Sequence, residues 1–315
     1  MKAMRYHSYG DSDVLVYEET DRPVAGAGQV VLKVAGAAFN PVDVPIRGGV
    51  LKDVFPVAFP HTPNYDVSGV VTETGEGVSG WSVGDAVVAF LPMTAPGAAA
   101  EYAVAPAEAL VAAPLTVELA DASALPSTVL TAWQSLFELA GLKPGQSVLI
   151  NGAGGAVGGY AVQLAAQAGA TVTATAGPRS HDRVRSYGAD RIVDYTATPV
   201  LEALAGRRFD VVLNLVLNLT PSAPEEVAQL VDELVADGGV FLSTTTPVPK
   251  SPARAIRATD VFVRSDATRL ADLVAQVNAG TLQIDVTSRR PLTDLPSIHD
   301  ECLAGRLPGK TIVIP

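Results

Sequence analysis

The sequence predicts an α/β protein with two domains, one built on a doubly wound parallel sheet and one rich in β-strands. Three observations predict this fold class. Short β-branched runs separated by glycines fill roughly the first hundred residues, strand-like runs alternate with helical periodicity through the middle of the chain, and a β-branched run closes it. At 315 residues and 48% hydrophobic content, the chain can fill two cores.

The first part of the chain has the pattern of a compact β domain. β-Branched runs at 29–36, 67–74 and 86–90 are separated by glycine-rich turns. A helical pattern follows over 128–142 and ends before Gly145. We therefore expect a change from strands to helices at about residue 120.

A glycine-rich turn connects the next strand and helix. It consists of Asn151, Gly152, Gly154, Gly155, Ala156, Val157 and Gly158. The apolar run 148–150 precedes it, and apolar residues on one helical face follow it. Glycines let the backbone approach a pyrophosphate, whose charge the helix N-terminus favours. We interpret the turn as a dinucleotide site, although its spacing departs from G-x-G-x-x-G and a purely structural turn is the alternative.

The strand after that helix, 171–175, favours NADPH over NADH. A site for NAD usually has an acidic residue at the end of this strand, whereas a 2′-phosphate prefers arginine. Here Thr175 ends the strand, no acid stands at its tip, and Arg179 and Ser180 follow. We interpret these two residues as 2′-phosphate ligands. The alternative is that Ser180 caps the next helix and that Arg179 and Arg183 are solvated.

Strands and helices continue to alternate after this unit. Strands are predicted at 191–195, 209–214, 238–244 and 261–264, and helices from about 199 and over 223–236. Six strands alternating with helices make a doubly wound sheet, which binds its ligand at the carboxyl ends of the strands. Asn214, Thr244 and Phe262, at strand ends, are therefore predicted to lie beside the cofactor.

The tail of the chain predicts helices at 267–279 and 295–304 and a strand at 311–314. Because the parallel sheet is already complete, we expect this last strand to pair with the N-terminal β domain.

Composition excludes several classes of function. A formal net charge of −11 argues against binding to nucleic acid or to an anionic membrane surface. The N-terminus lacks an apolar signal core and no window approaches the length of a membrane span, so we expect a cytoplasmic protein. Cys302 is the only cysteine, which excludes an internal disulfide and a thiolate-rich zinc site.

The order of these segments resembles the medium-chain dehydrogenase/reductase superfamily, in its zinc-independent quinone oxidoreductase and enoyl reductase branch. Besides the glycine-rich turn, the resemblance rests on segments 39–43, 64–71, 81–87, 100–102, 131–133, 187–190 and 309–313. It implies a GroES-like catalytic domain over 1–122, completed by 266–315, and a Rossmann NADP-binding domain over 123–265.

The resemblance implies hydride transfer without a metal. Zinc-dependent members use a cysteine and a histidine near the nicotinamide, and a four-cysteine lobe. Here Asn40 and Asp43 stand where the catalytic cysteine segment lies, and 64–66 reads Asn-Tyr-Asp where those members have Gly-His-Glu. We expect no metal site, and His61 to be a hydrogen-bonding or loop residue.

The resemblance also implies roles for individual residues. Asn40 is expected to face the nicotinamide and the substrate carbonyl, with Asp43 holding its loop; the alternative for Asn40 is a turn residue. Thr131 corresponds to a residue beside the nicotinamide, and Tyr195 to one near the adenosine phosphates. Asn64 replaces a glycine that is usual at its position.

The implied activity is NADPH-dependent reduction of a quinone or of the C=C bond of an α,β-unsaturated carbonyl compound. In the second case an enolate develops, so a donor at the carbonyl oxygen stabilises the transition state. Tyr65 is a candidate proton donor. The alternative is that water donates the proton and that Tyr65 has a structural role. A dedicated enoyl reductase of a polyketide or other natural-product intermediate, and a non-catalytic NADPH-binding protein, stay open. A homodimer is expected.

Overall fold

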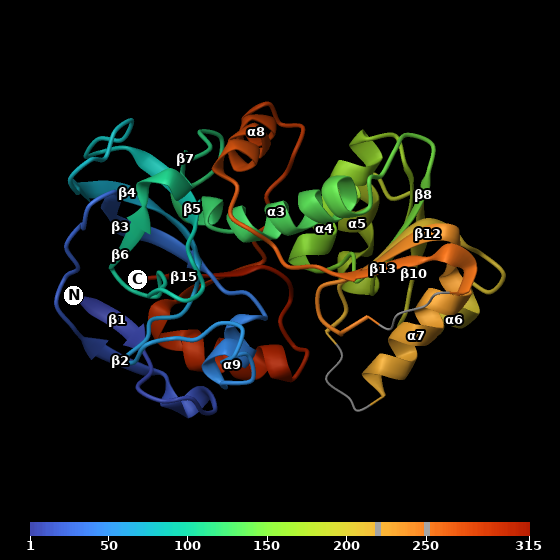
Figure 1. The fold of residues 1–315 in the computed structure, drawn as a ribbon, viewed down its shortest axis with the longest axis horizontal. Coiled ribbons are helices and arrows are strands. Elements are labelled where there is room, and N and C mark those ends of the chain that lie inside the picture. Colours follow the sequence, from blue (N-terminus) through green and yellow to red (C-terminus); the bar gives the residue numbers. More distant parts are fainter. Residues whose placement is uncertain (218–221, 249–252) are drawn as a thin grey trace. The chain divides into compact units, whose positions relative to one another are not determined.

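The computed structural model describes residues 1–217, 222–248 and 253–315 (Figure 1). These residues form two compact units. The β-rich unit comprises Met1–Ser127 and Ser265–Pro315, and the parallel-sheet unit comprises Thr128–Arg264. The α/β fold class predicted from the sequence, with a GroES-like and a Rossmann-like unit, is confirmed.

Parallel strands form the sheet of the parallel-sheet unit. In the described residues their order is β10 (Arg191–Val193), β9 (Thr171–Thr175), β8 (Ser147–Asn151), β11 (Phe209–Asn214), β12 (Val235–Ser243) and β13 (Arg257–Asp260). The first strand, β8, lies in the middle, and the winding direction reverses between β8 and β11. In doubly wound sheets, ligands bind at the carboxyl ends of the strands at this switch point.

Helices precede and connect these strands. They are α3 (Pro126–Trp133), which begins in the β-rich unit, the π-helical turn η3 (Gln134–Leu139), α4 (Ala156–Gln167), η4 (Pro178–Ser180), α5 (His181–Ser186), α6 (Val200–Ala203), α7 (Ala223–Leu234) and η5 (Ala253–Ala255). The single helix predicted over 128–142 is therefore an α-helix that widens into a π-helical turn.

Three strands of this sheet differ from the prediction, and the first of them, β10, ends at Val193 and not at residue 195. The last strand, β13, covers Arg257–Asp260 and not 261–264, and Phe262 lies beyond it with 72% of its surface exposed. An edge strand pairs on one side only, so a polar segment can form it while the apolar run next to it does not. The strand β12 covers Val235–Ser243 and not 238–244. It begins directly after α7, because Val235 pairs with Phe209 before a bulge displaces the register.

The β-rich unit contains a small antiparallel pair and a larger sheet. The pair consists of β1 (Lys2–Arg5) and β2 (Val16–Glu19). In the larger sheet the strand order is β14 (Ser288–Pro291), β15 (Thr311–Ile314), β3 (Gln29–Ala38), β4 (Asp66–Thr74), β5 (Ala86–Phe90) and β7 (Leu110–Ala112). The strand β6 (Tyr102–Pro106) also pairs with β3. Since β15 pairs with β3 at Ala37 and Ala38, the prediction that the last strand joins the N-terminal β domain is confirmed.

Short helices complete the β-rich unit. They are η1 (Ser12–Val14), α1 (Asp43–Arg47), η2 (Ala107–Ala109), α2 (Leu119–Ala122), α8 (Ala267–Asn278), η6 (Leu292–Asp294) and α9 (Leu295–Leu303). Ala38, Ala124 and Ile312 pack in one buried cluster, which joins the two ends of the chain. None of the helices in the described part of the chain has the length and apolar character needed to cross a membrane.

The approach of α4 to the glycine-rich turn leads to the first prediction. A Cβ on Gly158 would lie 2.5 Å from both Ala153 Cα and Gly152 O, and both are backbone atoms that cannot move aside easily. We expect Gly158→Ala to lower the free energy of unfolding by about 1–3 kcal/mol, as overpacking does.

The matched control is Gly159→Ala, one residue further along the same helix. There the nearest atom to a new Cβ is the Tyr187 ring at 3.3 Å, and alanine has the higher helix propensity. Thermal unfolding of the two variants should separate them. Equal melting temperatures would show that the turn tolerates a side chain at residue 158.

Candidate functional site

Three polar side chains join the carboxyl ends of β9, β8 and β11. Asn151 Nδ2 donates to Asn214 Oδ1 at 2.8 Å, and Thr175 Oγ1 donates to Asn151 Oδ1 at 2.8 Å. Thr175 Oγ1 also accepts from the N–H of Gly152 at 2.8 Å. All three side chains are buried. The structure thus brings Asn151, Thr175 and Asn214 together, and their hydrogen bonds tie the glycine-rich turn to the strand ends.

The glycine-rich turn exposes the N-terminus of α4. Gly152 has a φ of +96°, which favours glycine. Gly155 precedes the helix in an extended conformation, and no side chain caps the first turn, which begins with Ala156, Val157 and Gly158. The first N–H groups of a helix have no partner within the helix and are suited to bind phosphate.

The segment after β9 lies against this turn. A Cβ on Gly154 would clash with Ser180 Oγ, and Arg183 donates to the Gly154 carbonyl at 2.8 Å. Ser180 stands at the N-cap position of α5, but its hydroxyl donates to the Gly177 carbonyl at 3.2 Å and makes no cap. Arg179 is exposed. Ser180 is therefore next to the glycine-rich turn, and Arg183 is held by it.

The other residues predicted near the cofactor lie as follows. Tyr195 follows β10, and its hydroxyl is 3.4 Å from the point where a Cβ on Gly177 would stand. Thr244 follows β12 and donates its N–H to the Asn214 carbonyl at 3.2 Å. Thr131 is a buried residue of α3. Phe262 is not at the end of a strand as expected, because β13 ends at Asp260.

A polar cavity of about 260 Å³ lies at the opposite end of the parallel sheet. Its lining includes Lys143, Asp210 and Arg257, at or before the amino ends of β8, β11 and β13. It is therefore separate from the carboxyl edge that carries the predicted cofactor residues.

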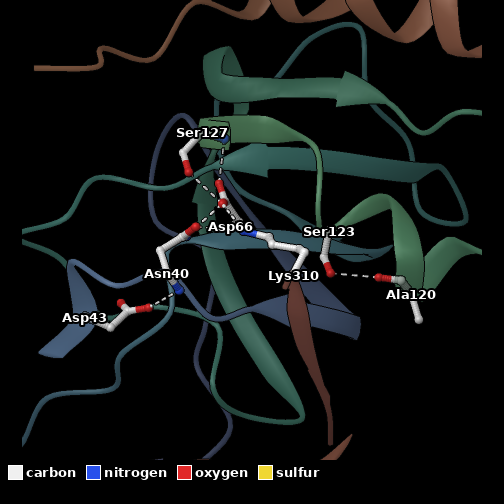
Figure 2. A network of polar contacts seen from close by, with 7 residues as sticks. All are labelled: Asn40, Asp43, Asp66, Ala120, Ser123, Ser127 and Lys310. Atoms are coloured by element: carbon white, nitrogen blue, oxygen red, sulfur yellow. Dashed lines mark hydrogen bonds and ion pairs between the residues drawn. The ribbon is translucent and has the colours of Figure 1, made fainter. Parts of the chain in front are cut away.

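In the β-rich unit, polar residues gather around the buried carboxylate of Asp66 (Figure 2). Ser127 donates its N–H to Asp66 Oδ1 at 2.7 Å and its hydroxyl to Oδ2 at 2.6 Å. Asn40 Nδ2 donates to Oδ2 at 2.9 Å, and the ammonium of Lys310 lies 3.7 Å from the same oxygen. A buried carboxylate is tolerated when it is paired and hydrogen-bonded in this way.

Asn40 is bonded to further members of this network. Lys310 Nζ donates to Asn40 Oδ1 at 2.7 Å, and the Asn40 N–H donates to Asp43 Oδ2 at 2.8 Å. Burial raises the pKa of Asp43 from 3.8 to about 7, and Asp66 adds to this shift, while the hydrogen bond from Asn40 opposes it. Burial lowers the pKa of Lys310, against the attraction of Asp66 and Asp43. The predicted residues Asn40 and Asp43 are thus in direct contact.

Tyr65 pairs with His61. Its hydroxyl lies 3.0 Å from His61 Nε2, and both side chains are buried. Burial raises the pKa of Tyr65 and lowers the pKa of His61 to about 4, so His61 is neutral near pH 7. In the part of the chain that the structure describes, no group of three or more His, Cys, Asp or Glu is arranged to hold a metal ion.

Asn64 adopts a backbone conformation typical of glycine. Its φ is +68°, in the left-handed region that asparagine tolerates better than most residues. Its carbonyl accepts from the N–H of Ala98 at 2.6 Å. The turn at this position therefore forms without the usual glycine.

Asp66, Ser127 and Lys310 were not identified as site residues from the sequence. Asn40 and Lys310 are 270 residues apart, and no local pattern joins them. A signal was present, since Asp66 is the first residue of an apolar strand and Lys310 stands directly before another, where a charged side chain is buried only if it finds a partner.

Two family models cover parts of this chain. The alcohol dehydrogenase GroES-like domain matches residues 26–115, and the zinc-binding dehydrogenase model matches residues 187–313. The chloroplast envelope quinone oxidoreductase homolog of Arabidopsis thaliana is 33% identical over 328 aligned positions, which cover 100% of this chain and 98% of the relative. The chain belongs to the medium-chain dehydrogenase/reductase superfamily.

Other relatives agree with this membership. A mitochondrial NAD(P)H oxidoreductase of Danio rerio is 28% identical and covers 99% of this chain and 91% of its own length. The solved quinone oxidoreductase of Coxiella burnetii superposes with a TM-score of 0.89 at 28% identity, over 100% of this chain and 99% of that one. Within the medium-chain dehydrogenase/reductase superfamily, the chain is an oxidoreductase of the quinone oxidoreductase branch.

The environment of Asp43 predicts a pH-dependent stability. Because the folded carboxyl holds its proton up to about pH 7 and the unfolded one releases it near 3.8, this group stabilises the fold at low pH. That contribution is lost as pH rises toward 7, at a rate of up to about 1.4 kcal/mol per pH unit.

Asp43→Asn should flatten this dependence, because an amide does not ionise. We expect the difference in melting temperature, variant minus unsubstituted protein, to increase as the pH rises from about 4 to about 7. Asp53→Asn, at an exposed loop position, is the control. If the melting temperatures of all three proteins changed with pH in parallel, the assignment of this pH dependence to Asp43 would be wrong.

Proposed function

We propose that the chain is a zinc-independent, NADPH-dependent reductase that transfers a hydride to a quinone or to the C=C bond of an α,β-unsaturated carbonyl compound. The observation that carries this proposal is the carboxyl edge of the parallel sheet, where the glycine-rich turn, the uncapped start of α4 and Ser180 lie together. The names of the relatives, as quinone and NAD(P)H oxidoreductases, support the same reading.

The residues at this edge fit a phosphorylated dinucleotide. The N–H groups of Ala156 and Val157, in the first turn of α4, would bind the pyrophosphate. Arg179 and Ser180 would bind the 2′-phosphate, and segment 176–181 has no carboxylate that would repel it. These features support NADPH over NADH.

The β-rich unit supports chemistry without zinc. The side chains of Asn40 and Asp66, in the segments where zinc-dependent members carry their ligands, bond to each other and to Lys310. The ammonium already supplies a positive charge at this point, and a second cation beside it would be repelled. The only cysteine, Cys302, lies on α9.

Asn40 and its neighbours would act on the substrate. Bound NADPH supplies the hydride. Asn40 would donate a hydrogen bond to the carbonyl oxygen, which becomes negative as the hydride adds to the β carbon. Asp43, which accepts the Asn40 N–H, would hold the loop. Water or Tyr65 would return a proton to the α carbon, and a quinone needs no dedicated acid.

We also propose a cytoplasmic homodimer. Among the described strands, β13 has one neighbour, β12, so its other edge can pair with a second copy. Sedimentation velocity should give about 65 kDa, twice the chain mass of 32.5 kDa. A single species at the chain mass would contradict the dimer.

The decisive experiment compares NADPH and NADH oxidation at matched concentrations, with 9,10-phenanthrenequinone and 1-octen-3-one as acceptors. We expect NADPH to be consumed with at least one of them. Better turnover with NADH would contradict the role given to Arg179 and Ser180. Binding of NADPH without turnover would favour a dedicated enoyl reductase or a non-catalytic NADPH-binding protein.

Replacing Arg179 tests the 2′-phosphate site directly. Arg179→Ala removes a charge-assisted hydrogen bond, so we expect the KM for NADPH to rise by about 10-fold to 100-fold. The KM for NADH should change little, because NADH lacks the phosphate. Arg306→Ala, at an exposed residue of the β-rich unit, is the control. An equal rise for both cofactors would place Arg179 outside the 2′-phosphate site.

A further inference from the structure

The side-chain amide of Asn40 lies between two opposite charges (Figure 2). Its oxygen accepts from the ammonium of Lys310 at 2.7 Å, and its nitrogen donates to the carboxylate of Asp66 at 2.9 Å. Lys310 and Asp66 are both buried, whereas Asn40 is only partly buried. The amide is therefore held at both ends by groups that cannot turn to water.

This arrangement allows one orientation of the amide. If Asn40 turned over, its NH₂ group would face the ammonium of Lys310 and its oxygen would face the carboxylate of Asp66. Both charge-assisted hydrogen bonds would be lost. The buried ammonium would then face the positive end of the amide dipole, and the buried carboxylate would face its negative end. The orientation of an asparagine amide is set by such partners.

The partners of Asp66 keep that carboxylate in place. Ser127 binds both of its oxygens, at 2.7 Å and 2.6 Å, from the first turn of α3. Lys310 stands directly before β15, whose pairing with β3 fixes the backbone near it. The two charges that hold Asn40 thus come from rigid elements.

We propose that Lys310 is a positioning residue, which together with Asp66 fixes Asn40 as a hydrogen-bond donor toward the oxygen atom of the substrate. An amide nitrogen carries two hydrogens, and the bond to Asp66 uses one. The second is donated to the carbonyl or quinone oxygen, where negative charge develops. This inference rests on the proposed function. It means that the orientation of Asn40 is set by Lys310, which lies 270 positions later in the sequence.

Kinetics of three variants test whether Lys310 acts through Asn40. Lys310→Met keeps an unbranched side chain as far as Cε and removes the ammonium donor. We expect kcat to fall by about 10-fold to 100-fold, as misplacement of a catalytic group does, with the KM for NADPH unchanged. Asn40→Ala should reduce kcat by about 100-fold or more. Lys33→Met, at an exposed position of β3, should leave kcat unchanged.

The double variant K310M/N40A separates positioning from an independent role. If Lys310 acts through Asn40, the double variant has the kcat of Asn40→Ala alone. If the two reductions multiply, or if Lys310→Met retains full kcat, the proposal is wrong. Where Lys310→Met does not fold, K310M/D66N removes both buried charges together, and the same loss of kcat is expected.

A measurement without turnover tests the orientation itself. In ¹⁵N-labelled protein, the side-chain NH₂ signal of Asn40, assigned by its loss in Asn40→Ala, should show one hydrogen protected from exchange by Asp66. That protection should weaken in the Lys310→Met variant, where Asp66 alone holds the amide, but persist unchanged in Lys33→Met. Protection that is undiminished by the loss of Lys310 would overturn the proposal. An unsubstituted protein with a protected hydrogen but no reductase activity would instead refute the proposed function alone.

Discussion

The β-rich unit depends on one constraint, that the buried carboxylate of Asp66 must have partners. A charge removed from water is costly unless hydrogen bonds and an opposite charge replace its hydration. Here the partners come from three distant segments: Ser127 at the start of α3, Asn40 before α1, and Lys310 before β15. Satisfying one carboxylate therefore brings together the parts of the chain that we propose to act on the substrate.

Much of the fold could be predicted, because its signals are local. The strands β5, β9, β11 and β15 have alternating or β-branched patterns, and the structure places them within a residue of the predicted ranges. The error at β13 has a physical cause. An edge strand forms from backbone pairing with β12, so its residues need not be apolar, and an apolar run nearby is misleading.

The candidate site was predictable to the extent that its contacts are local. The glycine-rich turn, Thr175 and Ser180 belong to one βαβ unit, where sequence spacing determines which atoms meet. The environment of Asn40 is different, since its partners are fixed by the pairing of β15 with β3 and by the start of α3. The partner of Tyr65 is four residues away, at His61, yet the buried bond between them also depends on tertiary packing.

The order of the segments has a consequence for biosynthesis. During translation, residues 1–127 emerge from the ribosome before Lys310 and β15 have been made. The first part of the β-rich unit therefore emerges with Asp66 lacking its cation and with the edge of β3 uncovered at Ala37 and Ala38. The parallel-sheet unit is contiguous and can fold as soon as it emerges. The β-rich unit can therefore be completed only after the whole parallel-sheet unit has been made. The edge of β3 at Ala37 and Ala38 stays unpaired until synthesis reaches the last strand, and an unpaired strand edge can pair with another chain.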